Sequence, residues 1–289
     1  MSSHFTTGTD TASLEAIEQV LLYKVEHGEL HLPLLPQVAS EVMALASNPK
    51  ADAAKLATLI HQDQALAAHV LRIANSPAYM PRSPIMSLQH AIAMLGFTLL
   101  SEIALAASIK AGVFQVPGHE EQVRTLWQHS LASGAFAKEI ARARRVNVES
   151  AYLCGLLHEI GKPVVLRTVV AIARERNLPL TKTTLDMLIE GHHAHIGSII
   201  GEQWGLPQQV VEATQYYRDY DHASSFRQEC LLTCVADQLA THLLCPDEVP
   251  EATLRNHPAL IELNLYPNDV EQLVKSKDKV LTIVESMNL

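Results

Sequence analysis

Aromatic residues are scarce in this sequence, and long apolar runs are missing. Its 289 residues include five Phe, seven Tyr and two Trp, whereas Ala and Leu abound. This composition favours helices packed closely on one another over a β-sandwich. Because no apolar run reaches ~18 uninterrupted residues, the sequence predicts no membrane-spanning helix.

Cysteine motifs and a leader are also missing. The four Cys residues form no CxxC motif, and Cys154 lies within an apolar run. We therefore expect reduced thiols rather than a disulfide framework. The N-terminal stretch MSSHFTTGTDTAS has neither the basic nor the apolar region of a signal peptide, so we expect a cytoplasmic protein.

Basic residues are outnumbered, 22 against 31 acidic ones, which gives a formal net charge of −9. A protein that binds nucleic acid without sequence preference needs a basic face to neutralise phosphates. The densest basic patch here holds only Arg142, Arg144 and Arg145, which is typical of a solvated helix end. The charge therefore argues against direct polynucleotide binding.

Apolar residues at helical spacing are abundant. Leu14, Ile17 and Leu21 share one helix face, for example, and similar spacing recurs in nearly every segment. With 48% hydrophobic residues, the chain can bury a sizeable core. We predict an all-α protein of roughly a dozen helices.

The break VPGHEE divides the predicted helices into two packed subdomains, with a boundary near residues 112–120. The polar tail over residues 1–12 is expected to be disordered. An N-terminal helical half then covers residues 13–115. The second half, with the C-terminal helices, covers residues 116–289.

One polar pair stands out in the stretch AYLCGLLHEIGKPVVL. Apolar or small residues surround His158 and Glu159 on both sides. Gly161 is predicted to end the helix, and Pro163 to keep it from resuming. A carboxylate beside an imidazole in such a run suggests that the interior needs both, although Glu159 could also be exposed.

Three other polar residues lie among apolar helix positions: His129, His195 and Asp237. A lone ionised carboxylate such as Asp237 would be costly to bury unless it is paired or bound to a cation. Each residue has a simpler explanation. A histidine on an apolar face is often a hydrogen-bonded core residue, and Asp237 could pair with His242 or with an Arg from another helix.

Taken together, these residues are similar to a family pattern. Their order resembles that of the HD superfamily of metal-dependent phosphohydrolases, in which an early His, a central His-Asp and a late Asp hold the metal. Other stretches resemble the HDOD branch of that superfamily, over about residues 25–220. They are LPLLPQVASEVMALASNPKADAAKLATLIH, SLQHAIAMLGFTLLSEIAL, GLLHEIGKPVVL and HAHIGSIIGEQWGLPQQVVEAT.

The resemblance implies a multi-helical HD-domain-like fold and one divalent metal ion, which could be iron, manganese, zinc or nickel. The implied ligands are His129, His158, Glu159, His195 and Asp237. The implied catalytic residues are Lys162 and Glu159, with Lys162 neutralising phosphate charge. Lys162 could equally well complement the end of its helix, a common use of lysine.

The sequence departs from the catalytic relatives of the family. The central His-Asp is His158-Glu159, Gln215-Tyr216 stands where those relatives carry a His pair, and the Gly-Tyr-Pro signature is missing. A second ion would lack its imidazoles there. Glu159, one methylene longer than Asp, could also pass the ion and bind water or Lys162.

Two functions follow from the resemblance. The first is a signal-transduction module with a degenerate metal site, acting through a signalling protein partner or a small nucleotide ligand. The alternative is a metal-dependent phosphohydrolase acting on a nucleotide or another phosphoester. Either function requires His129, His158 and Asp237 to converge, because a buried unpaired Asp237 would be costly.

Overall fold

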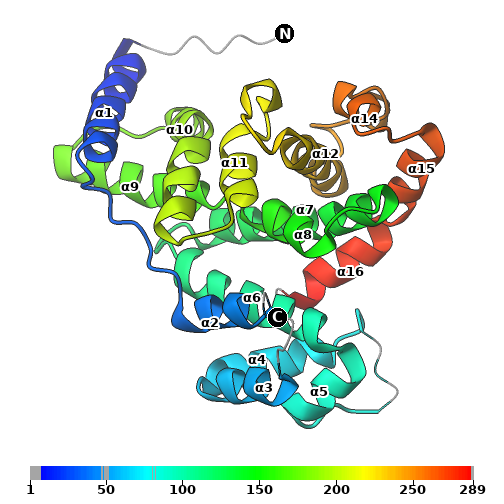
Figure 1. Ribbon diagram of the computed structural model, residues 1–289. Coiled ribbons are helices and arrows are strands. Elements are labelled where there is room, and N and C mark those ends of the chain that lie inside the picture. The colour runs from blue at the N-terminus through cyan, green and yellow to red at the C-terminus, as the bar shows by residue number, and fades with distance from the viewer. Residues whose placement is uncertain (1–7, 47, 49–51, 80, 82, 288–289) are drawn as a thin grey trace.

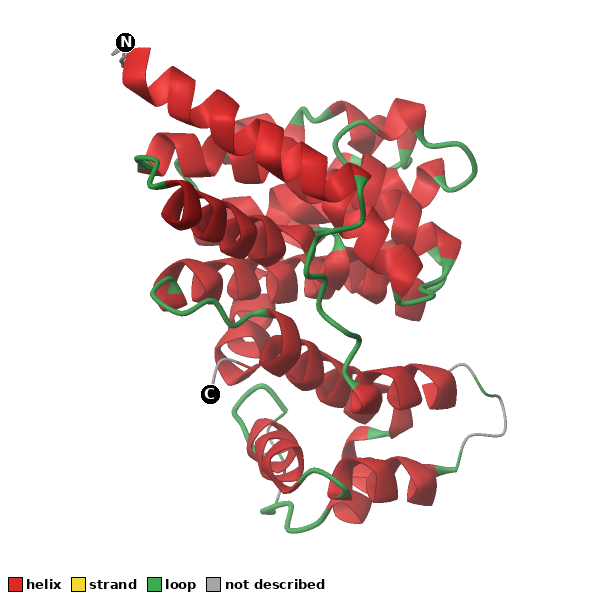
Figure 2. Cartoon of the chain, turned by 90° about the vertical axis from the view of Figure 1, so that its left-hand side faces the viewer, coloured by secondary structure: helices red, strands yellow, loops and turns green. Residues whose placement is uncertain are grey.

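The computed structural model is built of helices, and it contains no β-strand within the residues it describes, 8–46, 48, 52–79, 81 and 83–287. The predicted all-α class is therefore confirmed. The helices form two lobes, one above the other (Figures 1 and 2). No helix in these residues is both long enough and apolar enough to cross a bilayer.

The smaller lobe lies in the lower part of Figure 1 and, within the described residues, contains five helices. Three of them begin at the side chains that their sequences favour as N-caps: Asp52, Asp63 and Ser87 each accept a hydrogen bond from a backbone N–H in the following turn. The helices of this N-terminal lobe are α2 (Gln37–Ala46), α3 (Ala53–His61), α4 (Gln64–Ala74), α5 (Leu88–Leu95) and α6 (Phe97–Val113).

The larger C-terminal lobe is assembled around the long helix α7, whose buried Trp127 and Phe136 are among the largest core side chains. Helices α8, α12 and α16 pack against α7. The helices after α6 are α7 (Glu120–Arg144), α8 (Val148–Leu157), α9 (Gly161–Arg176), α10 (Lys182–Gln203), α11 (Gln208–Tyr216), the 3₁₀ turn η1 (Tyr220–His222), α12 (Arg227–Leu244), α13 (Glu251–Arg255), α14 (Pro258–Glu262), α15 (Pro267–Lys275) and α16 (Lys277–Met287).

Helix α1 (Gly8–Glu26) packs against α9 and α10 of the C-terminal lobe, although it precedes the N-terminal lobe in sequence. Residues 8–12, expected in the disordered tail, form the start of this helix, while residues 1–7 lie outside the described part. The segment 27–36 then runs across the molecule to α2 (Figure 2). The proposed division into two halves near residues 112–120 stays a prediction.

The chain around His158 differs from the expected helix. Helix α8 ends at Leu157, residues 158–160 form a turn, and α9 begins at Gly161, where the sequence was expected to stop a helix. Pro163 lies in the first turn of α9. Backbone N–H groups in that turn have no partner within the helix, so the missing N–H of proline costs little.

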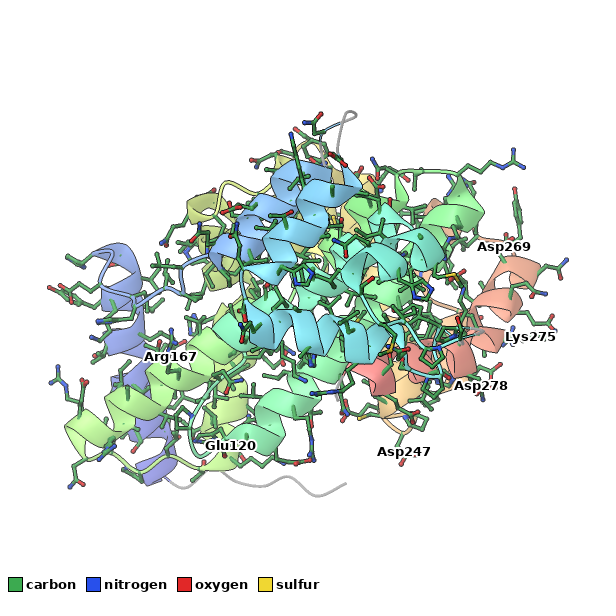
Figure 3. All side chains as sticks on the ribbon, turned by 90° about the horizontal axis from the view of Figure 1, so that it is seen from below. Glu120, Arg167, Asp247, Asp269, Lys275 and Asp278 are labelled. Carbon is green, nitrogen blue, oxygen red and sulfur yellow. The ribbon has the colours of Figure 1, made fainter. Side chains whose placement is uncertain are left out.

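Helix ends elsewhere are also shifted from expectation. The segments 182–190 and 193–204, predicted as two helices, form the single helix α10, and the predicted helix over 268–287 is divided into α15 and α16. Ser276 is the C-cap of α15, and its N–H bonds back to the Gln272 and Leu273 carbonyls. Charged side chains such as Asp247, Lys275 and Asp278 lie on the outside of the molecule, on or near these last helices (Figure 3).

Candidate metal centre

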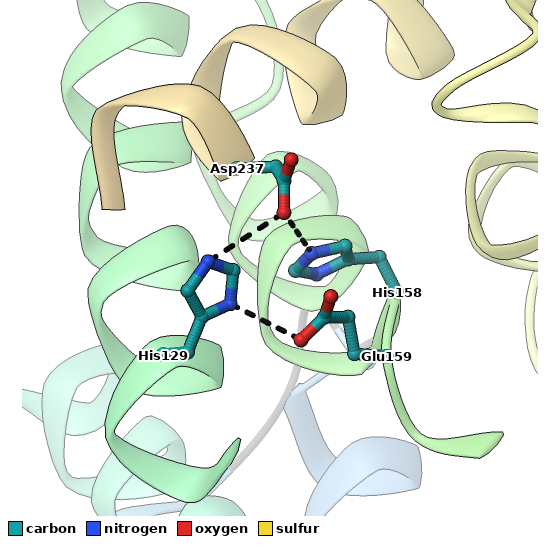
Figure 4. Close-up of side chains that lie close together, drawn as sticks. All are labelled: His129, His158, Glu159 and Asp237. Atoms are coloured by element: carbon teal, nitrogen blue, oxygen red, sulfur yellow. Dashed lines mark hydrogen bonds and ion pairs between the residues drawn. The ribbon is translucent and has the colours of Figure 1, made fainter. Parts of the chain in front are cut away.

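Four side chains from three parts of the C-terminal lobe converge, as shown in Figure 4. His129 comes from the middle of α7, His158 and Glu159 from the turn between α8 and α9, and Asp237 from α12. Each offers one nitrogen or oxygen atom, and these four atoms all lie within 4.8 Å of one another. The predicted convergence of His129, His158 and Asp237 is therefore present, and Glu159 joins them.

The turn that carries His158 and Glu159 is held by close backbone packing. A Cβ atom on Gly161 would lie 2.0 Å from the carbonyl oxygen of His193, and one on Gly155 would lie 2.6 Å from that of Ser133. Only glycine permits these approaches, because any side chain would overlap backbone atoms of α10 or α7. The small residues in GLLHEIG thus fix where the polar pair points.

The protonation of His158 follows from its neighbours. Its Nδ1 lies 2.8 Å from the Gly155 carbonyl oxygen, which can only accept, so Nδ1 carries a hydrogen. Its Nε2 lies 3.3 Å from Asp237 Oδ1. In a neutral imidazole, Nε2 would present a lone pair to a carboxylate. A proton or a metal cation is needed to make this contact favourable.

His129 repeats this arrangement. The Thr241 hydroxyl donates to the backbone carbonyl oxygen of Asp237, at 2.9 Å. Because this hydroxyl has only one hydrogen, it accepts a hydrogen bond from His129 Nε2, which lies 3.2 Å away. The other nitrogen, Nδ1, is buried without a hydrogen bond of good geometry, although Glu159 Oε2 lies 3.2 Å away. A second imidazole lone pair thus faces a second carboxylate.

The donor set fits a divalent ion. Two carboxylates and two neutral imidazoles carry two negative charges together, and this N/O mixture suits iron, manganese, nickel or zinc. The four candidate ligand atoms already lie within 4.8 Å of one another, so these residues could hold one ion together. The role of these residues as ligands stays a prediction.

Glu159 uses its two oxygens in different directions. Oε2 faces His129, while Oε1 pairs with Lys162 at 2.6 Å. Burial alone would raise the pKa of Glu159, but His129 and Lys162 outweigh it and hold that pKa well below its usual range. Glu159 is 2% exposed. Glu159 is therefore not exposed to solvent. It pairs with Lys162 and also contacts His129 of the cluster.

Burial alone would lower the pKa of His129, yet the charges of Glu159 and Asp237 outweigh it and raise that pKa. For Asp237, burial acts to raise the pKa, and the hydrogen bond with His158 and the charge of His129 lower it overall. The carboxylates of Glu159 and Asp237 therefore favour their ionised form, and together they stabilise a positive charge placed between them. His242, suggested as a partner of Asp237, contacts the Val249 carbonyl instead.

The structure does not bring His195 into the cluster. His195 is exposed, whereas His193, two residues earlier on α10, is 1% exposed. His193 Nδ1 donates to the Ile189 carbonyl, and its Nε2 lies 3.0 Å from the Tyr217 hydroxyl. Burial lowers the pKa of His193 to about 4. Sequence reasoning missed this residue because it selected the other histidine of the same motif.

Tyr217 is the second residue that sequence reasoning missed. Its ring packs edge-on against His158, with centroids 4.7 Å apart, and its hydroxyl lies 3.4 Å from Glu159 Oε1. Burial raises its pKa well above the usual range. A signal was present, because Tyr217 follows Val210 and Ala213 at helical spacing on an apolar face.

Lys162 is held by two carboxylates, Glu159 at 2.6 Å and Glu190 at 2.7 Å. Arg218 pairs with the other oxygen of Glu190. Gln215, which stands where catalytic relatives carry a histidine, accepts a hydrogen bond from Ser198 at 2.6 Å. Each of these polar groups is thus already engaged within the protein.

Several solved structures share this fold. A protein provisionally described as a metal-dependent phosphohydrolase, from Shewanella amazonensis SB2B, aligns with a TM-score of 0.72 and 20% identity over 96% of this chain and 99% of its own. An HDOD domain protein of unknown function from Geobacter sulfurreducens aligns with a TM-score of 0.70 and 21% identity over 96% and 97%. At these identities the likeness establishes the fold.

Curated sequences match shorter parts. An uncharacterized protein of Treponema pallidum (strain Nichols) is 28% identical over 203 residues, and a ribonuclease Y of Thermus thermophilus is 27% identical over 146 residues. These matches cover 66% and 48% of this chain but only 38% and 21% of the relatives. The HDOD domain family model matches residues 32–220. Since that match covers more than half of the sequence, the chain belongs to the HDOD family.

Proposed function

We propose that this protein is a signal-transduction module of the HDOD type that holds one divalent metal ion with His129, His158, Glu159 and Asp237. The observation that carries the proposal is the pair of imidazole nitrogens, each facing a carboxylate oxygen across 3.2–3.3 Å. One divalent ion would balance the two carboxylates and accept both lone pairs. The module acts through a signalling protein or a small nucleotide.

Burial and charge support a binding role over rapid turnover. His158, Glu159 and Asp237 are 0%, 2% and 3% exposed, so a bulky phosphodiester has little room to reach them. Lys162, the cation nearest the cluster, is neutralised by Glu159 and Glu190. A phosphate group would have to displace one of these carboxylates to use the ammonium group.

The second candidate function is a metal-dependent phosphohydrolase. The His129 side chain is 15% exposed, so this edge of the cluster is the most open to solvent. A divalent ion, when bound, supplies a water of lowered pKa and polarises a phosphoryl oxygen. In this case the Glu159 carboxylate would be a proton acceptor beside the substrate. Lys162 would release Glu190 and neutralise part of the phosphate charge.

Metal analysis tests the first proposal. Protein purified without chelator should contain about one equivalent of a divalent transition metal. His158→Ala and Asp237→Ala should each lose it, while His195→Ala, an exposed histidine of the same lobe, should retain it. Metal-free protein that folds normally would overturn the metal site.

A panel of phosphomonoesters, phosphodiesters and nucleotides separates the two functions. The signalling proposal predicts no turnover that depends on both the metal and His158. Turnover that disappears in His158→Ala but persists in His195→Ala would favour the phosphohydrolase. Lys162→Ala should then reduce that turnover further if the ammonium group contacts the substrate.

A further inference from the structure

A cavity of about 490 Å³ lies where the two lobes meet. Its walls come from α6 and the end of α5 in the N-terminal lobe, and from α7 and α16 in the C-terminal lobe. Sites for small ligands typically have volumes of roughly 300–1,000 Å³, so this cavity is large enough to be one. The four residues of the candidate metal centre do not line it.

The wall that α7 contributes changes from apolar to basic along the helix. Four residues of α7 line the cavity on one stripe, because they follow one another at steps of four, three and four positions: Leu131, Ala135, Lys138 and Arg142. At 1.5 Å per residue this stripe is about 16 Å long. One end of the cavity wall is therefore apolar and the other end carries two cations.

Helix α16 shows the same order of residues. Lys279, Ile283 and Met287 line the cavity at steps of four positions, which again places them on one stripe. Lys279 Nζ lies 2.8 Å from Glu139 Oε1, and Arg142 Nη1 lies 2.5 Å from the same oxygen. The basic ends of the two stripes therefore meet at one carboxylate, and the apolar positions of both helices follow from that point.

The charges of the wall favour an anion at this basic end. Three cations and two carboxylates line the cavity: Lys138, Arg142, Lys279, Glu102 and Glu139. Lys138 pairs with Glu102, so Arg142 and Lys279 share the single charge of Glu139. The Arg142 and Lys279 side chains are 47% and 61% exposed, so a ligand can reach them. One positive charge is thus left for an anion in a chain whose net charge is −9.

The rest of the wall favours an aliphatic chain. Leu95, Phe97 and Leu99 of the N-terminal lobe face Leu131 and Val280 of the C-terminal lobe across the cavity. An apolar chain placed between these side chains is removed from water together with them. A cavity of about 150 Å³ holds benzene, so this cavity has room for roughly a dozen carbon atoms or more. Its shape and charge together suit a long, apolar ligand with an anionic head.

We propose that this cavity binds a fatty acid. The carboxylate would lie between Arg142 and Lys279, and the chain would follow the apolar positions of α7 and α16 into the cavity. The guanidinium and ammonium groups carry five and three N–H donors, so both can bind the carboxylate while they keep Glu139. A ligand that contacts both lobes stabilises their observed arrangement over any other, which gives the module a small-molecule input apart from its metal centre.

Calorimetric titration of the full chain with decanoate, below the concentration at which it forms micelles, tests the proposal. Saturable binding is expected, and acetate and decyltrimethylammonium should bind at least tenfold more weakly, because the first lacks the chain and the second reverses the charge. Lys279→Gln should weaken decanoate binding at least tenfold by removing a cation from the head group. Ile283→Phe should weaken it as much without a change of charge, because the larger side chain occupies the space of the aliphatic chain.

Lys275→Gln is the charge-matched control, because Lys275 is an exposed lysine of α15 that does not line the cavity, and it should bind decanoate like the wild type. Binding should also persist in His158→Ala, so failure of the metal proposal would not affect it. Three results would overturn the inference: no saturable binding at millimolar decanoate, equal affinities in Lys275→Gln and Lys279→Gln, or wild-type affinity in Ile283→Phe. Urea unfolding of each variant confirms that it is folded.

Discussion

At the scale of single residues, His193 shows how burial and hydrogen bonding fix a protonation state. Its Nδ1 donates to a backbone carbonyl, and its Nε2 meets the Tyr217 hydroxyl, which also lies near Glu159. Because burial dominates, its pKa falls to about 4 from the ordinary 6.5. The neutral ring therefore completes the hydrogen-bonded wall behind the candidate metal ligands.

This shift predicts a pH-dependent stability. The folded pKa is depressed, so the stabilisation is fully present above pH 6.5 and is lost as the pH falls toward 4. Across that window His193 should contribute about 3 kcal/mol to the fall in the free energy of unfolding. His193→Gln keeps an acceptor for Tyr217 but does not titrate, so its stability should fall less over the same range.

Urea unfolding at several pH values with a chelator present measures this difference, because the chelator removes any pH-dependent metal binding. His195→Gln is the matched control, since His195 is exposed on the same helix. Its profile should follow that of the wild type. Equal slopes for His193→Gln and the wild type would show that His193 is not the buried neutral residue described above.

At the scale of helices, the contact of α9 with α10 decides where the His158–Glu159 turn lies. A methyl group on Gly161 would overlap the His193 carbonyl oxygen and also approach the Gly197 nitrogen to 2.8 Å. Gly197 itself packs against Thr214 of α11. Three helices are thus brought together by small residues, and the turn beside them inherits that geometry.

Gly161→Ala should therefore destabilise the protein by about 3 kcal/mol, because backbone atoms must move to admit the methyl group. Gly191 is the matched control, since it lies in α10, is exposed and would have no neighbouring atom within 4 Å of an added methyl group. Gly191→Ala should stabilise the helix by about 0.5–1 kcal/mol. Denaturant unfolding of the two variants would contradict this account if both changes had the same sign.

At the scale of the whole molecule, the segment 27–36 connects α1 to α2 across the C-terminal lobe (Figure 2). Two side chains of that lobe hold its backbone: Arg167 donates to the His31 carbonyl at 2.7 Å, and Trp204 Nε1 donates to the Pro33 carbonyl at 2.8 Å. These two bonds fasten the connecting segment to the C-terminal lobe.

Trp204→Phe keeps an aromatic ring but removes the bond to Pro33, which is worth about 0.5–1.5 kcal/mol. Amide hydrogen exchange in the segment 27–36 should therefore become faster, while α8 and α9 keep their protection. Trp127→Phe is the control, because the Trp127 nitrogen has no hydrogen-bond partner and the residue lies in α7. Faster exchange of the segment in both variants would indicate general loosening instead.

The sequence by itself determined the helical class and the branch of the HD superfamily, and it predicted that His129, His158 and Asp237 meet while leaving the place of Glu159 open. Apolar spacing reports which residues of a helix are buried, and His129, His158, Glu159 and Asp237 each interrupt such a buried face. The same spacing also favoured His195, however. Apolar spacing shows that a helix has a buried face, but it does not show which other helices pack against that face.

Only the tertiary structure decided which histidine of α10 turns inward and where the chain turns beside His158. His193 and His195 are about 200° apart around the helix axis, so the rotation of α10 about that axis decides which of them is buried. That rotation is fixed by the contact of Gly161 with the His193 carbonyl, which joins residues 32 positions apart in the sequence. A contact between distant backbones leaves no periodic signal, and the position of Tyr217 behind His158 depends on the same packing.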